Sequence, residues 1–520
     1  MQAAFVIRNP CTATSTTSCA TSAAIDDERV EDVESILEFA LWGLLFEDLR
    51  LASRALAALA PHDGVWAVRV AAARVVLRSH QGSDLLGVPE LAPGAPESHD
   101  AVRVESMLIR LSGSRCRART DETAGLLAEM TRLDTEGTLE APGSPPLLRA
   151  LLRVQLAIAH LHAGSSAVAL AHLAVAARLA DTCATLHRSI LAKSATVHAL
   201  RGNLVEARRQ LRRFDRVDGE IPAPWLRALR EEQALAEAMM LVERFDNHEP
   251  EMEWPEVEAS DDLWPITALL RARLALLERS PMRALEIVEF AETTHPGWNS
   301  VFAEDVIAAM KAHALLQLSE PDRARDVLAQ APQGPLVVLA TAHLQMFVGD
   351  ADAARELATA VLDRSTSSLA ERAEALLVRI WADAVLGRMP TAREGGIVGR
   401  MVVAAGLVRI IAHMPGWLMD QMVDLSERGV RPAFEAAVDK ASAALVITER
   451  PQLTPRETVV LKALERHGSV SDMAKALSVS PSTVKTQLSA IYRKLGVSSR
   501  HHAVPAAYRL GLLERASNPG

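Results

Sequence analysis

A short segment near the C-terminal end of the chain combines positive charge with hydroxyl groups at helical spacing. Residues 481–495 follow a serine and begin with proline, so we expect them to form a helix. The polar face of this helix carries Lys485, Thr486, Ser489, Tyr492 and Arg493. Lysine and arginine bind phosphate oxygens, and amine and hydroxyl groups form hydrogen bonds with the edges of bases. The chemistry that this face offers is recognition of a nucleic acid.

The opposite face of segment 481–495 is apolar, and it indicates that other helices must hold the segment in place. Val484, Leu488, Ile491 and Leu495 stand at i, i+4, i+7 and i+11, which places them along one side of a helix. A single short helix cannot bury such a stripe by itself. The polar face is therefore expected to project from a small helical core.

Two shorter helices are predicted before this segment, and each has a start signal. Thr454 and Glu457 form a capping box, with a proline at the first helical position between them. A second helix starts at Ser469, and a turn at 478–480 leads into 481–495. A tight helix-turn-helix of this kind places its last short helix in the major groove of DNA.

Charge is distributed unevenly along the 520 residues. Residues 454–511 contain nine lysines and arginines against three acids, a net charge of +6, whereas the whole chain carries −9, which leaves about −15 on the remainder. Basic side chains that neutralise phosphates release condensed counterions, so a basic module is a signature of nucleic-acid binding. The alternative interpretation is a small three-helix bundle that docks protein and whose charge is merely solvated.

The same segment resembles the LuxR/NarL-type helix-turn-helix of bacterial transcription regulators from Leu453 to about Leu513. The matching residues include Leu453-Thr454-x-Arg456-Glu457, Val460-Leu461, Ala474-x-x-Leu477-x-Val479-Ser480, Thr483-Val484-Lys485, Ile491-x-x-Lys494-Leu495-Gly496-Val497, Arg500 and Ala503. The resemblance implies a four-helix DNA-binding domain over 453–515, with the helix-turn-helix at 470–490. It also implies double-stranded DNA as the partner, a homodimer on the DNA, and RNA polymerase as a further candidate partner.

The resemblance assigns roles to side chains of segment 481–495. Its base-contacting positions fall on Lys485, Thr486 and Ser489, and its backbone-contacting positions fall on Ser482, Thr483, Gln487 and Lys494. Arg493 completes the predicted DNA-binding set. The chain departs from the family pattern at Gln487, where His is usual, at Ala490, where Asn is usual, and at Pro505, within the predicted fourth helix.

Pairs of alanines twelve residues apart recur between residues 145 and 400. The pairs are Ala157/Ala169, Ala195/Ala207, Ala272/Ala284, Ala312/Ala324 and Ala342/Ala354. Seven positions after the first alanine of each pair stands a predicted turn residue: Gly164, Gly202, Arg279, Ser319 and Gly349. A small residue on each helix allows two helices to cross closely, so the pattern predicts repeated helical hairpins that must stack to bury their apolar faces.

These repeats resemble tetratricopeptide repeats, which have small residues at the corresponding positions. The predicted fold is therefore all-α, a tetratricopeptide-like solenoid followed by the four-helix domain. The expected division is a disordered tail at 1–27, a helical sensor or interaction domain at 28–445, a linker at 446–452 and the DNA-binding domain at 453–515. Stacked repeats form a concave surface that binds a peptide, a protein or a small effector.

The sequence does not support an enzyme. It contains no phosphate-binding loop, no H-E-x-x-H, no G-x-S-x-G and no Rossmann fingerprint, so we expect no catalysis, cofactor or metal. The glycines of segment 395–400 are expected to mark a helix break. The histidines between 160 and 198 do not place three on one face, so satisfied or surface side chains are favoured over a metal site. The acidic segment 249–262 is either a solvated loop or a docking surface for a basic partner.

The cellular setting follows from what the sequence lacks. Four cysteines, at positions 11, 19, 116 and 183, show no C-x-x-C spacing, which is typical of a reduced, cytoplasmic protein. No secretory signal is evident, and no apolar run is long enough for a membrane span. Arginine greatly outnumbers lysine, a hint of a bacterial source. The leading hypothesis is a bacterial transcription regulator controlled through its helical body; the alternative is a helical-repeat scaffold whose C-terminal module docks protein.

Overall fold

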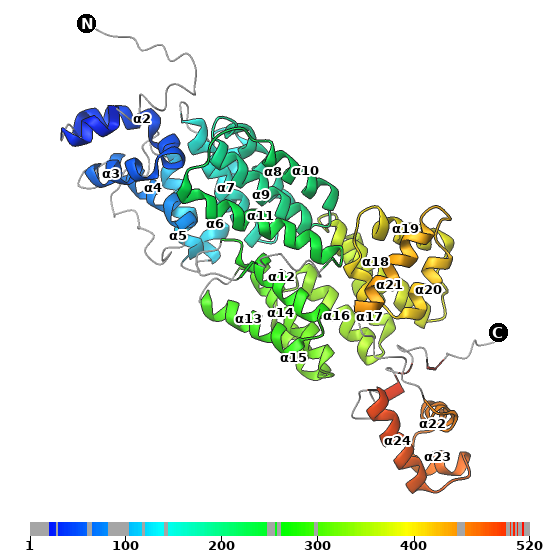
Figure 1. Cartoon of the computed structure of the whole chain (residues 1–520). Coiled ribbons are helices and arrows are strands. Elements are labelled where there is room, and N and C mark those ends of the chain that lie inside the picture. The colour runs from blue at the N-terminus through cyan, green and yellow to red at the C-terminus, as the bar shows by residue number, and fades with distance from the viewer. Residues whose placement is uncertain are drawn as a thin grey trace.

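The computed structural model confirms the all-α prediction for the part of the chain that it describes (Figure 1). It describes residues 20–27, 30–59, 65–81, 103–116, 120–139, 144–246, 255–256, 262–295, 300–444, 453–495, 500, 503–504, 507 and 512–513. Helices and their connecting turns account for these residues, and no strand occurs among them. No helix within these ranges is long and apolar enough to cross a bilayer.

The body of the protein is a series of helices packed against their neighbours in the chain (Figure 1). The N-terminal helices are α2 (Val30–Glu47), α3 (Leu49–Leu59), α4 (Val65–Gln81), α5 (Arg103–Cys116) and α6 (Thr120–Thr135). The central helices are α7 (Pro146–His162), α8 (Ser166–Leu179), α9 (Ala184–Leu200), α10 (Leu204–Asp215), α11 (Ala223–Glu243), α12 (Trp264–Leu277), α13 (Pro281–Thr294), α14 (Val301–Gln317), α15 (Pro321–Gln330), α16 (Pro335–Val348), α17 (Ala351–Asp363), α18 (Leu369–Val385) and α19 (Ala392–Val403).

The alanine pairs lie where two helices of a hairpin cross. Each pair joins consecutive helices that contact one another, α7 with α8, α9 with α10, α12 with α13, α14 with α15, and α16 with α17. All ten alanines are buried. The turn residue of each hairpin has a left-handed backbone, including the non-glycine residues Arg279 (φ 54°) and Ser319 (φ 62°). First helices of successive units also contact one another, for example α12 with α14 and α14 with α16, which is consistent with a stacked array. The tetratricopeptide assignment itself stays a prediction.

One turn shows that helices distant in the sequence meet in the body. Gly202, between α9 and α10, has a φ of 81°, and a Cβ there would lie 2.8 Å from the backbone nitrogen of Ala370. The Ala370 N–H donates a hydrogen bond to the Arg201 carbonyl oxygen at 3.1 Å. The beginning of α18 therefore packs directly against the α9–α10 turn.

The structure corrects the predicted extent of the N-terminal tail. Residues 20–26 are helical rather than disordered, because Ala24 and Ile25 pack into the body core and Asp26 pairs with Arg54 of α3. Residues 1–19 lie outside the described part of the chain, as does most of the acidic segment 249–262 and the whole predicted linker 446–452.

The predicted helix break at the glycines of segment 395–400 is wrong. These residues belong to the continuous helix α19, which starts with a capping box formed by Thr391 and Glu394. Gly395 faces the end of α20 (Gly416–Asp424), where a Cβ would lie 2.8 Å from the Leu425 carbonyl carbon. The glycines allow close packing of helices instead of ending one.

Two glycines inside helices should therefore respond oppositely to alanine. We expect Gly395→Ala to lower the free energy of unfolding by about 1–3 kcal/mol, because its new methyl group forces the α19–α20 contact apart. Gly125 lies exposed in α6 with no atom within 4 Å of a Cβ, so Gly125→Ala should raise stability by roughly 0.5–1 kcal/mol. Urea unfolding of both variants tests this; destabilisation of equal size at both positions would contradict the packing role.

The C-terminal module has a core of its own. After η3 (Arg409–His413), α20 and α21 (Arg431–Ala444) come α22 (Pro455–Arg466), α23 (Val470–Ala476) and α24 (Pro481–Leu495). Helices α22, α23 and α24 contact one another in pairs. Their shared apolar cluster contains Val460, Leu461, Leu464, Met473, Ala474, Val484, Leu488, Ile491 and Leu495, with Ala503, Ala507 and Leu513 from the following segment.

Candidate nucleic-acid interface

Side-chain caps start all three helices of the C-terminal module where the sequence predicts them. The Thr454 N–H donates to Glu457 Oε2 at 2.7 Å, and the Glu457 N–H donates to Thr454 Oγ1 at 3.2 Å, which completes the capping box of α22. Ser469 accepts from the Asp472 N–H at 3.2 Å and begins α23. These bonds satisfy N–H groups that a helix start leaves unpaired.

The turn before α24 sets the direction in which this helix leaves α23. Ser478 has a φ of 54°, in the left-handed region, and the Val479 N–H donates to the Ala474 carbonyl oxygen at 3.0 Å. Ser480 then accepts a hydrogen bond from the Thr483 N–H at 3.1 Å. Its hydroxyl also lies 2.7 Å from Ser482 Oγ and 2.8 Å from Thr483 Oγ1. The first turn of α24 is therefore fixed by a cluster of three hydroxyls.

Helix α24 has one buried face and one exposed face, as its sequence predicts. Val484, Leu488, Ile491 and Leu495 are all buried in the core of the module. Ser482, Lys485, Thr486 and Ser489 are exposed on the other side. This division into a buried and an exposed face follows from the sequence. The spacing of the apolar residues places them on one side of the helix and the polar residues on the other.

The structure describes the side chains of six of the eight predicted DNA-binding residues, and these six differ in exposure. Ser482, Lys485, Thr486 and Ser489 are exposed, whereas Thr483 and Gln487 are half-buried. The side chains of Arg493 and Lys494 lie outside the described part of the structure, as does Pro505. The Thr486 hydroxyl donates to the Ser482 carbonyl oxygen at 3.1 Å, so its methyl and oxygen are held in a defined position.

Tyr492 differs from the sequence prediction, which placed it on the polar face. It is half-buried and packs against the apolar core of the module. Burial raises the pKa of the Tyr492 phenol, although the nearby positive charge of Arg500 opposes this. The hydroxyl therefore remains protonated at neutral pH and can act only as a neutral hydrogen-bond donor or acceptor.

Arg500 has a role that spacing alone did not reveal. Its guanidinium donates to the carbonyl oxygens of Leu464 (2.7 Å), Gly468 (3.0 Å) and His467, at and just after the end of α22. The last carbonyls of a helix lack internal partners and carry partial negative charge, so a cation there is stabilising. Of the nine lysines and arginines in residues 454–511, Arg500 is thus bonded to carbonyl oxygens of the module itself. No local pattern connects residues more than thirty positions apart, so only the family resemblance singled out Arg500.

The module matches a family model described as the luxR family of bacterial regulatory proteins over residues 451–507. The spore germination protein GerE of Bacillus subtilis is 37% identical over 65 residues, which are 12% of this chain and 88% of that protein. The transcriptional regulatory protein YdfI of Bacillus subtilis is 45% identical over 62 residues, 12% of this chain and 29% of that protein. No solved structure matches the chain significantly.

One similarity extends beyond the C-terminal module. An HTH-type transcriptional regulator of Mycobacterium bovis is 27% identical over 263 residues, 49% of this chain. The alignment is several times longer than the family match, so it must include part of the helical body. The chain spans only 27% of the length of that relative.

The family assignment rests on agreement between sequence and geometry. The caps, the left-handed turn and the apolar stripe of α24 form the helix-turn-helix that the sequence predicts. GerE is similar to this module over nearly its whole length. The chain therefore belongs to the luxR family of bacterial regulatory proteins.

Proposed function

We propose that this protein is a DNA-binding transcription regulator in which α24 enters the major groove of double-stranded DNA. The observation that carries the proposal is the two-faced α24, with Val484 and Leu488 in the core and Lys485 and Ser489 exposed. In helix-turn-helix proteins the N-terminal residues of the second helix of the motif contact base edges. Among the side chains that the structure describes, Ser482, Lys485 and Thr486 are exposed in this half of α24, and Ser489 lies one residue past its middle.

The contacts with DNA are proposed to divide into two kinds. Lys485, Thr486 and Ser489 would contact base edges, because amine and hydroxyl groups can form hydrogen bonds there. Ser482, Thr483, Gln487 and Lys494 would contact phosphates, and Arg493 would add positive charge. The start of α24 supports this division, since helix N-termini favour anions.

The helical body is proposed to control the module. Two copies of the module on a two-fold-symmetric site would supply the specificity that one short helix lacks. The body would respond to a small effector or to a partner protein, and RNA polymerase is a candidate partner for the DNA-bound form.

Binding of the full-length protein to a random-sequence duplex should depend steeply on salt. Because phosphate contacts release counterions, we expect the affinity to fall about 100-fold or more between 50 and 200 mM salt. Fluorescence anisotropy of a labelled 30-base-pair duplex measures this directly. Absence of binding at 50 mM salt would refute DNA recognition and favour the scaffold hypothesis, in which the module docks protein.

A further inference from the structure

The outward face of helix α10 carries a row of positive charge. Five of the nine residues from 208 to 216 are exposed arginines, which we call the arginine stripe: Arg208, Arg209, Arg212, Arg213 and Arg216. With 3.6 residues per helical turn, the five fall within about 140° of the circumference. Helix α10 lies along the upper edge of the body, so the stripe faces solvent (Figure 1).

The opposite face of α10 holds the stripe in a fixed position. Helix α10 packs along α9 and buries four apolar side chains: Leu204, Ala207, Leu211 and Phe214. Just beyond its end, the Arg188 guanidinium donates to the Val217 carbonyl oxygen at 2.6 Å. Just before its start, the turn at Gly202 packs against the beginning of α18. The arginines are thus displayed by a helix that is anchored at both ends.

The arginines of the stripe repel one another. Three pairs stand four residues apart: 208 with 212, 209 with 213, and 212 with 216. Like charges at this spacing are neighbours on a helix surface and destabilise it. Arg209 lies 3.5 Å from Glu206. In the described part of the chain, however, Arg208, Arg212 and Arg216 form no ion pair. Much of the positive charge of the stripe is therefore left without a partner.

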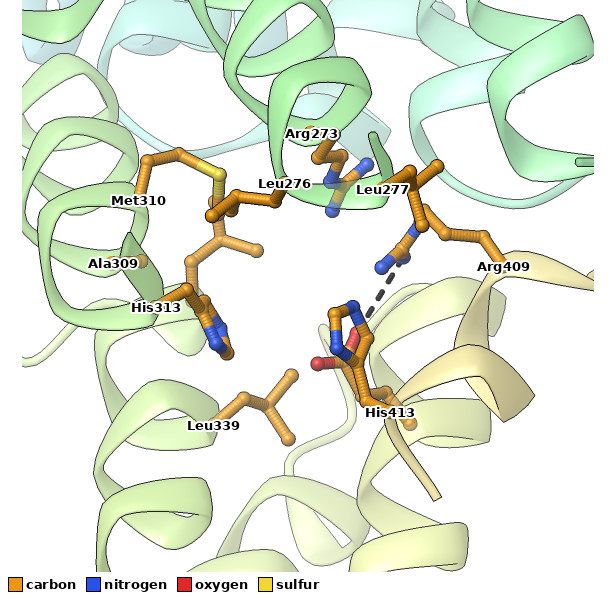
Figure 2. Close-up of a pocket in the computed structure, with 11 residues that line it drawn as sticks. Arg273, Leu276, Leu277, Ala309, Met310, His313, Leu339, Arg409 and His413 are labelled. Carbon is orange, nitrogen blue, oxygen red and sulfur yellow. Dashed lines mark hydrogen bonds and ion pairs between the residues drawn. The ribbon is translucent and has the colours of Figure 1, made fainter. Parts of the chain in front are cut away.

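Several other arginines of the body are matched to carboxylates. Arg273 and Arg409, drawn in Figure 2, are buried, and both donate to Glu243. Arg409 Nη2 also lies 3.5 Å from Glu374 Oε2. On the surface of α15, both arginines pair with an acid three residues before them. The stripe differs from these groups because its charge is concentrated on one face and mostly uncompensated.

The surroundings of the stripe are basic although the body as a whole is acidic. Residues 201–230 contain eight arginines and four acids, a net charge of +4, whereas the chain outside the C-terminal module carries about −15. Three of these acids, Asp215, Asp218 and Glu220, stand at the C-terminal end of the stripe and form no ion pair with it in the described residues. A local excess of positive charge attracts a polyanion.

A nucleic acid fits the stripe better than an acidic protein does. Protein interfaces have an apolar centre rich in aromatic residues. Every residue of α10 is described, and Val205 is the only large apolar side chain that this helix exposes. Guanidiniums are planar and bind phosphate oxygens through paired N–H groups. The stripe extends about 12 Å along the helix, a length over which double-stranded DNA carries roughly seven phosphate charges.

We propose that the arginine stripe of α10 binds the phosphate backbone of double-stranded DNA. Its guanidiniums donate to phosphate oxygens and release condensed counterions, and they do not read the base sequence. The inference rests on the proposed function, in which α24 brings the protein to DNA. The stripe holds the helical body against DNA outside the site that α24 reads, so it contributes equally on every sequence.

Removal of charge from the stripe tests this contact. The variant combines Arg208→Gln, Arg212→Gln and Arg216→Gln, the three arginines without an ion pair. Fluorescence anisotropy measures binding of the full-length protein to a labelled 60-base-pair duplex of random sequence between 50 and 200 mM salt. Each lost phosphate contact reduces the slope of log affinity against log salt by about 0.9, so the slope should become shallower by roughly 2–3.

Two further variants control for net charge and for folding. Arg132→Gln, Arg323→Gln and Arg325→Gln together remove the same charge from exposed arginines that already pair with acids. Because these arginines contact no phosphate, the slope should change by less than about 0.5. Replacing the same three stripe arginines by lysine keeps their charge, and lysine also binds phosphate, so the slope should stay within about 0.5 of that of the unaltered protein.

Three results would overturn the phosphate contact and leave DNA binding itself intact. They are an unchanged slope in the stripe glutamine variant, an equal change in the variant that loses paired arginines, and a lysine variant as shallow as the glutamine variant. An acidic protein would then be the partner to seek for the stripe. If the unaltered protein binds no DNA at 50 mM salt, both proposals fail. If the stripe variant lowers the slope but Lys485→Ala leaves the sequence preference unchanged, the stripe stands and base reading by Lys485 fails.

Discussion

Glu243→Gln should lower the free energy of unfolding of the helical body by about 3–5 kcal/mol, because it removes one charge from a buried network. The Glu243 side chain is fully buried and accepts from Arg273 and Arg409. The glutamine keeps the shape of the side chain but leaves two buried guanidiniums facing the single carboxylate of Glu374. Urea unfolding of the full-length protein, followed by helical circular dichroism, measures the loss.

Glu256→Gln is the matched control for this experiment. Glu256 pairs with Arg271 at 2.6 Å, a distance similar to that of the Glu243–Arg273 pair, but its side chain is 69% exposed. Water and salt screen an exposed pair, so the control should cost less than about 1 kcal/mol. Losses of similar size in the two variants would show that the buried charges of the network are not what stabilises the body.

Local pattern was sufficient to predict the hairpins of the body. Alanine pairs twelve residues apart identified the crossing points, and the residue seven positions after the first alanine proved to have a left-handed backbone even at Arg279 and Ser319. Both features depend on residues close in sequence. The capping box at Thr454 and the apolar stripe of α24 were predictable for the same reason.

Features that depend on distant residues were not predictable in this way. Arg273 lies in an apolar helix, and its spacing does not reveal that Glu243 and Arg409 surround it. The glycines of segment 395–400 have the composition of a helix break, but their neighbours are distant in the sequence: Gly395 faces the end of α20, and Gly399 faces Phe434 of α21. The buried network of Glu243, Arg273, Glu374 and Arg409 escaped the sequence analysis because its residues come from helices far apart in the chain.

Lys485→Ala should weaken binding of the full-length protein to its preferred DNA sequence by about 1–3 kcal/mol, which is roughly fivefold to 150-fold. The ammonium group is exposed on the face of α24 opposite Val484 and Leu488, where a base edge could accept its hydrogen bonds. Selection from a pool of random duplexes supplies the preferred sequence. Repeating the selection with the variant should show a relaxed preference at one position of the site.

Lys462→Ala is the matched control, which distinguishes the loss of a base contact by Lys485 from the mere loss of one positive charge. Lys462 is exposed on α22, so its loss changes the net charge of the module equally without altering α24. We expect it to weaken binding to selected and random duplexes by the same small factor, since a distant lysine contributes only to the sequence-independent attraction. If Lys485→Ala behaves in the same way, Lys485 contacts phosphate rather than a base; if it has no effect on either duplex, Lys485 does not belong to the recognition surface.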